Sequence, residues 1–101
     1  MTTKAIKTCE KASGGRLTLG KAIRSIRMKD DIKQGVFAKT LGVTQSYLSD
    51  LERDCKEVSP QKAADFARRL AWSEKQLIRL AIQDTLCRQG LHYKVDLRDE
   101  A

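Results

Sequence analysis

Hydrophobic residues recur at intervals of three or four through most of the chain, the spacing that places them on one face of an α-helix. The first such stripe follows Thr18 and consists of Leu19, Ile23 and Ile26. The mostly polar stretch 28–31 interrupts the pattern. We therefore predict a first helix that begins at Thr18 and ends within that stretch.

A glycine interrupts the pattern in the next part of the chain. The second stripe begins near Lys33 or Gln34, and its apolar residues are Phe37, Ala38 and Leu41. Gly42 follows directly, and glycine adopts the left-handed conformation that ends a helix without strain. Thr44 has the side chain that caps a new helix, predicted to run to about Arg53. Two helices joined by so tight a turn meet at a steep angle, as in a helix-turn-helix.

Two more helices are predicted in the second half of the chain. Ser59 can cap the fourth helix, and Pro60 fits its first position because the N–H that proline lacks would be unpaired there. Ser73 and Gln76 have the spacing of a capping box, which predicts the start of a fifth helix. This helix is expected to end near Gly90. The fold is therefore expected to be all-α, with five helices.

The last stretch has a different period. Residues 91–97 alternate between apolar and polar, which predicts a short β-strand with one apolar side. That side consists of Leu91, Tyr93, Val95 and Leu97. A single strand has no hydrogen-bonding partner of its own. The strand is therefore expected to pair with another copy of the chain, with the N-terminal arm, or with another protein.

Charge is distributed unevenly along the 101 residues, whose formal net charge is +7. Residues 1–16 carry four basic residues and one acidic residue, residues 17–70 carry eleven and seven, and residues 71–101 carry five of each. The basic part is suited to a polyanion, and the neutral part to a protein. We therefore expect a flexible basic arm (1–16), one domain (17–72), and a segment for dimer or partner binding (73–101).

Other classes of protein are not favoured. The chain has one histidine and three widely spaced cysteines without a CxxC pair, so no metal site is expected. No nucleophile–base pair or phosphate-binding glycine loop is recognisable, so neither an enzyme nor a cofactor is expected. The N-terminus lacks the apolar core of a secretory signal, and no apolar run is long enough to span a membrane. A cytoplasmic protein is expected.

The stretch from the first helix to the fourth also resembles a known family. The motifs that carry the resemblance are IRSIR in the first helix, Gln34 followed by Phe37-Ala38, Leu41-Gly42-Val43-Thr44, Tyr47-Leu48-Ser49 and Leu51-Glu52-Arg53. Over roughly residues 17–72 the chain resembles the DNA-binding domain of lambda-repressor and Cro-like regulators, often called the Xre family. The resemblance implies a lambda-repressor-like helix-turn-helix fold and binding to double-stranded DNA.

The resemblance also implies roles for individual residues. Gln45 stands on the outer face of the recognition helix, where its amide can form two hydrogen bonds to adenine. Gln34 stands at a phosphate-binding position at the start of the preceding helix. The full set of expected DNA-binding residues is Gln34, Thr44, Gln45, Ser46, Tyr47, Ser49, Asp50, Arg53 and Lys56. Arg27 and Glu52 are expected to form a structural ion pair that orients helices and does not read bases.

Three residues depart from the family pattern. Lys33 stands where a capping Ser or Thr is usual, and Gly35 replaces a helix-forming residue. Asp54 stands where a glycine usually follows the recognition helix, and aspartate tolerates a left-handed turn less readily. Asp50 is also unusual on a DNA-binding face, because its charge repels phosphate although it can accept a hydrogen bond from cytosine.

Two functions are compatible with this pattern. The first is a transcriptional repressor that binds a palindromic operator as a homodimer through the recognition helix, residues 44–53. The second is an antitoxin that neutralises a toxin protein and represses its own operon, with residues 1–16 or the tail after Gly90 in contact with the toxin. Both use the same DNA-binding part, so the two alternatives remain open at this point.

Overall fold

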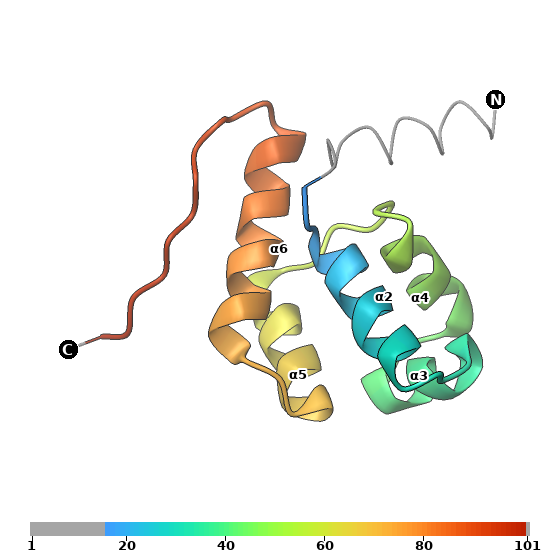
Figure 1. The fold of residues 1–101 in the computed structure, drawn as a ribbon. Helices are drawn as coiled ribbons and strands as arrows, with labels where there is room; N and C mark the ends of the chain where they lie inside the picture. The colour runs from blue at the N-terminus through green and yellow to red at the C-terminus, as the bar shows by residue number, and fades with distance from the viewer. Residues whose placement is uncertain (1–15, 101) are drawn as a thin grey trace, which may run out of the picture.

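The computed structural model describes residues 16–100, and Figure 1 shows that they form an all-helical domain followed by an extended C-terminal tail. The expected basic arm lies, except for Arg16, outside the described residues. The five helices are α2 (Leu19–Lys29), α3 (Gln34–Leu41), α4 (Gln45–Glu52), α5 (Pro60–Leu70) and α6 (Glu74–Arg88). The all-α fold with five helices is thus confirmed for the described part of the chain.

Local capping chemistry sets where the helices begin. The side-chain oxygens of Thr18, Thr44, Ser59 and Ser73 each accept a hydrogen bond from the backbone N–H three residues later, at 3.0 to 3.2 Å. Each bond satisfies one of the N–H groups that a helix N-terminus otherwise leaves unpaired. The exception is α3, where Lys33 occupies the cap position and provides no side-chain hydrogen bond.

The core is built from the apolar faces of all five helices. Ile23, Leu48 and Phe66 are completely buried and join α2, α4 and α5. Each of these three side chains stabilises the fold by about 1.5–3 kcal/mol through its burial. Among residues 16–100, no helix combines the length and the apolar character needed to cross a membrane.

The start of α2 packs directly against the end of α4. A Cβ atom at Gly20 would lie 1.9 Å from the backbone oxygen of Leu51 and 2.8 Å from Oδ1 of Asp54. Real Cβ atoms do not approach backbone this closely, so only glycine allows the two helices to approach at this position. The end of α4 is thereby held at a fixed place on the first helix of the domain.

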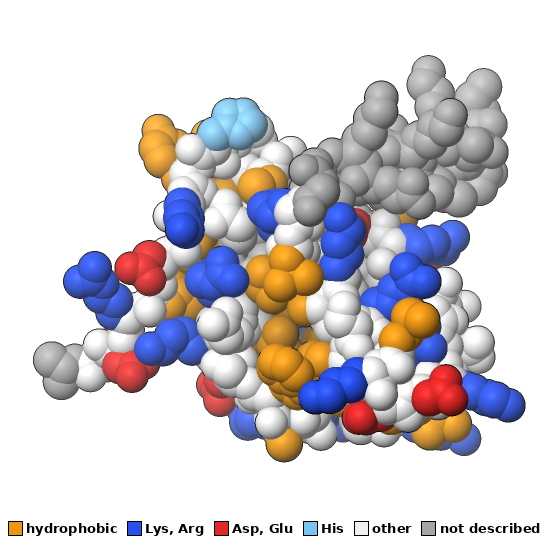
Figure 2. Space-filling view, viewed as in Figure 1, with side chains coloured by type: hydrophobic (Ala, Val, Ile, Leu, Met, Phe, Trp, Pro, Cys, Tyr) orange, Lys and Arg blue, Asp and Glu red, His pale blue; other side chains and the backbone are white. Residues whose placement is uncertain are grey.

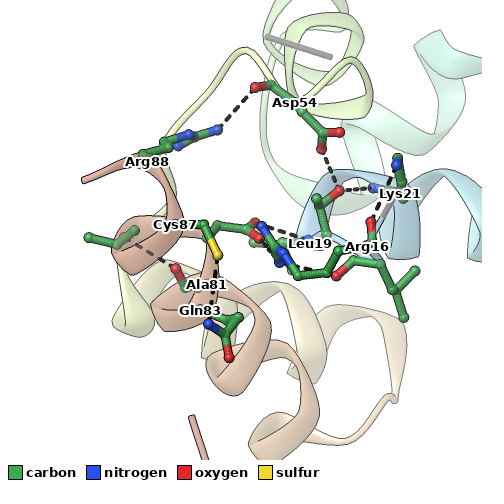
Figure 3. A network of polar contacts seen from close by, with 12 residues as sticks. Arg16, Leu19, Lys21, Asp54, Ala81, Gln83, Cys87 and Arg88 are labelled. Carbon is green, nitrogen blue, oxygen red and sulfur yellow. Dashed lines mark hydrogen bonds and ion pairs between the residues drawn. The ribbon is translucent and has the colours of Figure 1, made fainter. Parts of the chain in front are cut away.

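A polar network fixes the turn that follows α4 (Figure 3). The hydroxyl of Thr18 donates a hydrogen bond to the carboxylate of Asp54, whose backbone φ of 63° lies in the left-handed region. Arg88, at the end of α6, donates to the backbone oxygens of Asp54 and Lys56 at 3.1 and 2.9 Å. These contacts tie the exit of α4 to both α2 and α6, and they support the strained residue Asp54.

A second carboxylate, which belongs to α6, fixes the start of α2. Asp84 accepts hydrogen bonds from the backbone N–H of Leu19 at 3.0 Å and from the guanidinium of Arg16 at 2.7 Å. Burial raises the pKa of Asp84, although both hydrogen bonds and the charges of Arg16 and Arg88 counteract this shift. The anionic form therefore carries a net desolvation cost in the folded chain.

The replacement Asp84→Asn is expected to change how stability depends on pH. Because the folded-state pKa of Asp84 is raised, its carboxyl group keeps a proton more readily in the folded chain than in the unfolded chain. Its contribution to stability therefore falls as pH rises from the ordinary range of an aspartate towards the raised pKa. Urea unfolding of both proteins over about pH 3–7 should show the native chain losing stability relative to the variant as pH rises. A constant difference would contradict this.

The expected β-strand at residues 91–97 does not form: the described tail contains no strand. The tail instead runs back along α6 as an extended chain (Figure 1). The buried side chain of Gln83 on α6 donates to the backbone oxygen of Tyr93 at 2.7 Å and accepts from the backbone N–H of Val95 at 2.8 Å. One side-chain amide thus takes the place of a neighbouring strand, since none is available within the described chain.

Candidate nucleic-acid interface

The turn between α3 and α4 has the conformation predicted for it. Gly42 adopts a φ of 74° and a ψ of 29°, and its N–H bonds back to the oxygen of Lys39 at 3.1 Å. The N–H of Val43 bonds to the oxygen of Ala38 at 2.9 Å. Val43 packs partly against the core, so the turn is closed by hydrogen bonds and by burial. The direction of α4 relative to α3 follows from this turn.

The outer face of α4 is polar and accessible. Gln45 and Ser46 are exposed in its first turn, and Ser49 is half-buried one turn later. Leu48 and Leu51 on the opposite face are almost completely buried. The hydroxyl oxygen of Thr44 caps the helix, but its O–H remains able to donate a hydrogen bond. The helix therefore presents hydrogen-bonding side chains outward on a face that is fixed from beneath.

An ion pair on the buried side of α4 fixes the C-terminal end of this helix. Arg27 contacts Glu52 through two hydrogen bonds of 2.7 and 2.9 Å, and donates a third to the backbone oxygen of Ile32. These hydrogen bonds to the carboxylate raise the pKa of Arg27, against the effect of burial. The side-chain amide of Gln34 also donates to Glu52, at 3.0 Å. Gln34 thus connects the start of α3 to the end of α4.

A depression of about 650 Å³ lies between the N-terminal parts of α3 and α4. Its lining residues are Lys33, Gln34, Gly35, Val36, Ala38, Lys39, Val43, Thr44 and Gln45, which include two lysines and no carboxylate. Because α3 has no side-chain cap, its first N–H groups are available to an external acceptor. The chemistry of the depression suits an anionic oxygen.

Two lysine side chains lie over the ring of Tyr47, at the edge of the same face. The ammonium of Lys56 lies 5.6 Å from the centre of its ring, and that of Lys62 lies 4.7 Å from it. Burial raises the pKa of Tyr47, and its hydroxyl can donate a hydrogen bond. Lys62 was not predicted from the sequence, because nothing in the order of residues places the first turn of α5 beside Tyr47.

The charge of Asp50 is partly neutralised by a neighbour on the chain. Arg53 contacts the carboxylate of Asp50 at 2.6 Å, and both side chains are substantially exposed. Repulsion between Asp50 and a nearby phosphate is thereby reduced, and the pair is free to rearrange. The structure thus gathers the expected DNA-binding residues on α4 and on the segments that flank it.

Another part of the surface, between α2 and α6, has a different character. Figure 2 shows hydrophobic side chains gathered between α6 and α2, with lysine and arginine side chains on both sides. Leu17 and Trp72, both about half exposed, line a depression there of about 410 Å³ together with Ile26, Leu77 and Leu80. This apolar surface is separate from the polar face of α4.

Comparison with known families identifies the class of protein. The model of the helix-turn-helix family HTH_3 matches residues 23–74, just over half of the chain. The chain therefore belongs to this family of Xre and lambda-repressor-like helix-turn-helix proteins, which are DNA-binding transcription regulators and not enzymes. Neither curated proteins nor solved structures gave a significant match. Within residues 16–100, no group of three or more potential ligands is placed to hold a metal ion.

Proposed function

We propose that the protein is a sequence-specific transcriptional repressor that binds a palindromic operator as a homodimer. The observation that carries this proposal is the exposed polar face of α4, held from beneath by Leu48, Leu51 and the Arg27–Glu52 pair. Such a rigid helix can enter the major groove, where each base pair presents a distinct hydrogen-bonding pattern. The protein acts in the cytoplasm, on the DNA of the nucleoid.

Base reading is assigned to the first half of α4. The exposed amide of Gln45 can donate to N7 and accept from N6 of adenine at the same time. Ser46 and Ser49 follow on the same face and reach base edges or phosphates. Asp50 accepts from the amino group of a cytosine once Arg53 turns towards the DNA backbone.

Phosphate binding is assigned to the surfaces beside α4. On one side, the uncapped N-terminus of α3 lies next to Lys33 and Lys39. On the other side, Lys56 and Lys62 lie against the ring of Tyr47. The recognition helix therefore has cations on both flanks, as expected for a helix that lies between two sugar–phosphate backbones. Gln34 orients this arrangement through Glu52 and can also meet a phosphate.

The replacement Gln45→Ala tests the base-reading role. It is expected to weaken binding to the operator by about 1–3 kcal/mol and to relax specificity at one base pair. The operator is first selected from a random DNA pool, and binding is then measured on the selected site and on unrelated DNA. The matched control Lys39→Ala is expected to weaken binding to the operator and to unrelated DNA equally. It should also reduce the slope of log K against log salt concentration by about one. Equal losses on both DNAs for Gln45→Ala would contradict base reading.

Two-fold symmetry of the selected site would support the homodimer. Two recognition helices in a dimer meet half-sites about one helical turn, ~34 Å, apart. We assign residues 73–101 to the contacts between subunits or with a partner, because this segment is electrically neutral and carries exposed apolar residues such as Leu91 and Tyr93. A selected motif without internal symmetry would contradict a two-fold dimer.

The second candidate function is that of an antitoxin. The observation that favours it is the extended tail after Gly90, whose unpaired backbone groups suit the edge of another protein's sheet. In this case the same DNA-binding face would repress an operon that also encodes a toxin. A toxin reading frame beside the gene, with a product that co-purifies with the chain, separates this candidate from a plain repressor.

A further inference from the structure

Only one edge of the C-terminal tail is used within the described chain. The backbone oxygen of Tyr93 and the backbone N–H of Val95 both contact the amide of Gln83. In an extended chain, the backbone groups of successive residues point to opposite edges. The N–H and C=O groups of Lys94 and Asp96 therefore point away from Gln83. Neither residue has a backbone hydrogen bond to any other part of residues 16–100.

We propose that this open edge pairs with the same edge of a second copy, as two antiparallel strands related by a two-fold axis. The inference rests on the homodimer proposed above and identifies the surface that forms it. The axis passes beside Val95, which faces the Val95 of the second copy. Each strand then has Gln83 of its own chain on one edge and the tail of the other chain on the opposite edge.

The sequence of the tail is complementary to itself in this register. Lys94 faces Asp96 of the second copy, and Asp96 faces Lys94, so two pairs of opposite charge form. Tyr93 faces Leu97 of the second copy, and the two Val95 side chains lie between these apolar pairs. Opposite charges and apolar pairs stabilise directly opposed positions in an antiparallel ladder.

The neighbouring registers lack this complementarity. An axis beside Lys94 places two lysines opposite each other, and an axis beside Asp96 places two aspartates opposite each other. Like charges in directly opposed positions are destabilising. The charge pattern therefore favours an axis beside Val95 over an axis one residue away on either side.

The two faces of the tail suit this arrangement. Val95 and Leu97 are half-buried, whereas Lys94 and Asp96 are exposed, so the apolar and polar faces of a strand are already separated. Tyr93 remains 71% exposed and gains a neighbour when the second tail covers it. An isolated two-stranded ribbon is marginally stable in water, but here Gln83 and an ion pair of 3.0 Å between Lys75 and Asp99 hold each strand on α6.

Charge reversal tests the proposal through the mass of the free protein. We expect sedimentation equilibrium of the full chain without DNA to show a reversible dimer at concentrations on the order of 1–100 µM. Asp96→Lys places lysine opposite lysine twice and is expected to raise the dimer dissociation constant about tenfold or more. The double variant Lys94→Asp/Asp96→Lys restores opposite charges and is expected to return to within about threefold of the native value.

Each unfavourable result is informative. A native chain that stays monomeric over this range would overturn the proposal and leave the open edge for a different protein. An unaffected Asp96→Lys variant, or a double variant that remains weak, would overturn the pairing with this register. Binding of each variant to DNA with a single operator half-site is measured in parallel. If the native chain does not bind the half-site, the role of α4 in DNA binding is contradicted. The dimer dissociation constant from sedimentation equilibrium would not be affected by that result.

Discussion

Replacing Arg27 with methionine is expected to lower the free energy of unfolding by about 3 kcal/mol. The side chain of Glu52 is only 4% exposed, and Arg27 provides two of its hydrogen bonds. Without Arg27, a buried carboxylate remains with Gln34 as its hydrogen-bonding neighbour. The expected loss lies at the low end for a broken buried ion pair because Arg27 is itself 16% exposed. Urea unfolding of the two proteins measures the difference.

Arg53 provides the matched control for this experiment. Arg53 follows Glu52 in the sequence and forms an ion pair with Asp50. The side chains of this pair are 45% and 38% exposed. Arg53→Met should therefore cost less than about 1 kcal/mol. The double variant Arg27→Met/Glu52→Leu should recover most of the stability that Arg27→Met loses. A large loss in the Arg53 variant, or none in the Arg27 variant, would contradict the difference in burial.

The variant Gly20→Ala is expected to be the second strongly destabilised protein. Alanine normally stabilises a helix by about 1 kcal/mol relative to glycine. At this position, however, the added methyl group would meet the backbone oxygen of Leu51 at 1.9 Å, so α2 and α4 must move apart. Overpacking of this kind costs about 1–3 kcal/mol or more, and here the obstacle is backbone that cannot rotate away. A lowered thermal midpoint, together with weaker binding to the operator, is the expected result.

Gly35→Ala is the corresponding control. Gly35 also lies within a helix. A Cβ atom added there would lie 3.3 Å from Oε1 of Gln45, which is the end of a flexible side chain. This variant should gain up to about 1 kcal/mol of stability from helix propensity. If Gly35→Ala and Gly20→Ala proved equally stable, the close contact between α2 and α4 would not be the reason why glycine is present at position 20.

Features that depend on a few neighbouring residues were predictable from the sequence. Thr44, Ser59 and Ser73 cap helices because the bond partner lies three residues away, and Gly42 ends α3 because its conformation is a local property. Lys33 stands at the cap position of α3 and provides no side-chain hydrogen bond there. For the same reason, the boundaries of the helices agree closely with those expected from periodicity.

Features that depend on residues far apart in the chain were not predictable in this way. Asp84 secures the start of α2 from α6, and Lys62 reaches Tyr47 from α5. The predicted strand at 91–97 was wrong as secondary structure, although the alternating pattern did indicate an extended chain. Periodicity gives the preferred backbone conformation of a segment, but it does not show that a single glutamine, Gln83, serves as its hydrogen-bonding neighbour.

The single tryptophan of the chain, Trp72, has a practical consequence for spectroscopy. It follows α5 and lines the apolar depression beside α2 and α6, and it is 48% exposed. Its emission will therefore respond to whatever covers that surface, without an added dye. Titrations with nucleic acid will require a label elsewhere, because Trp72 lies outside the helix-turn-helix face that α3 and α4 form.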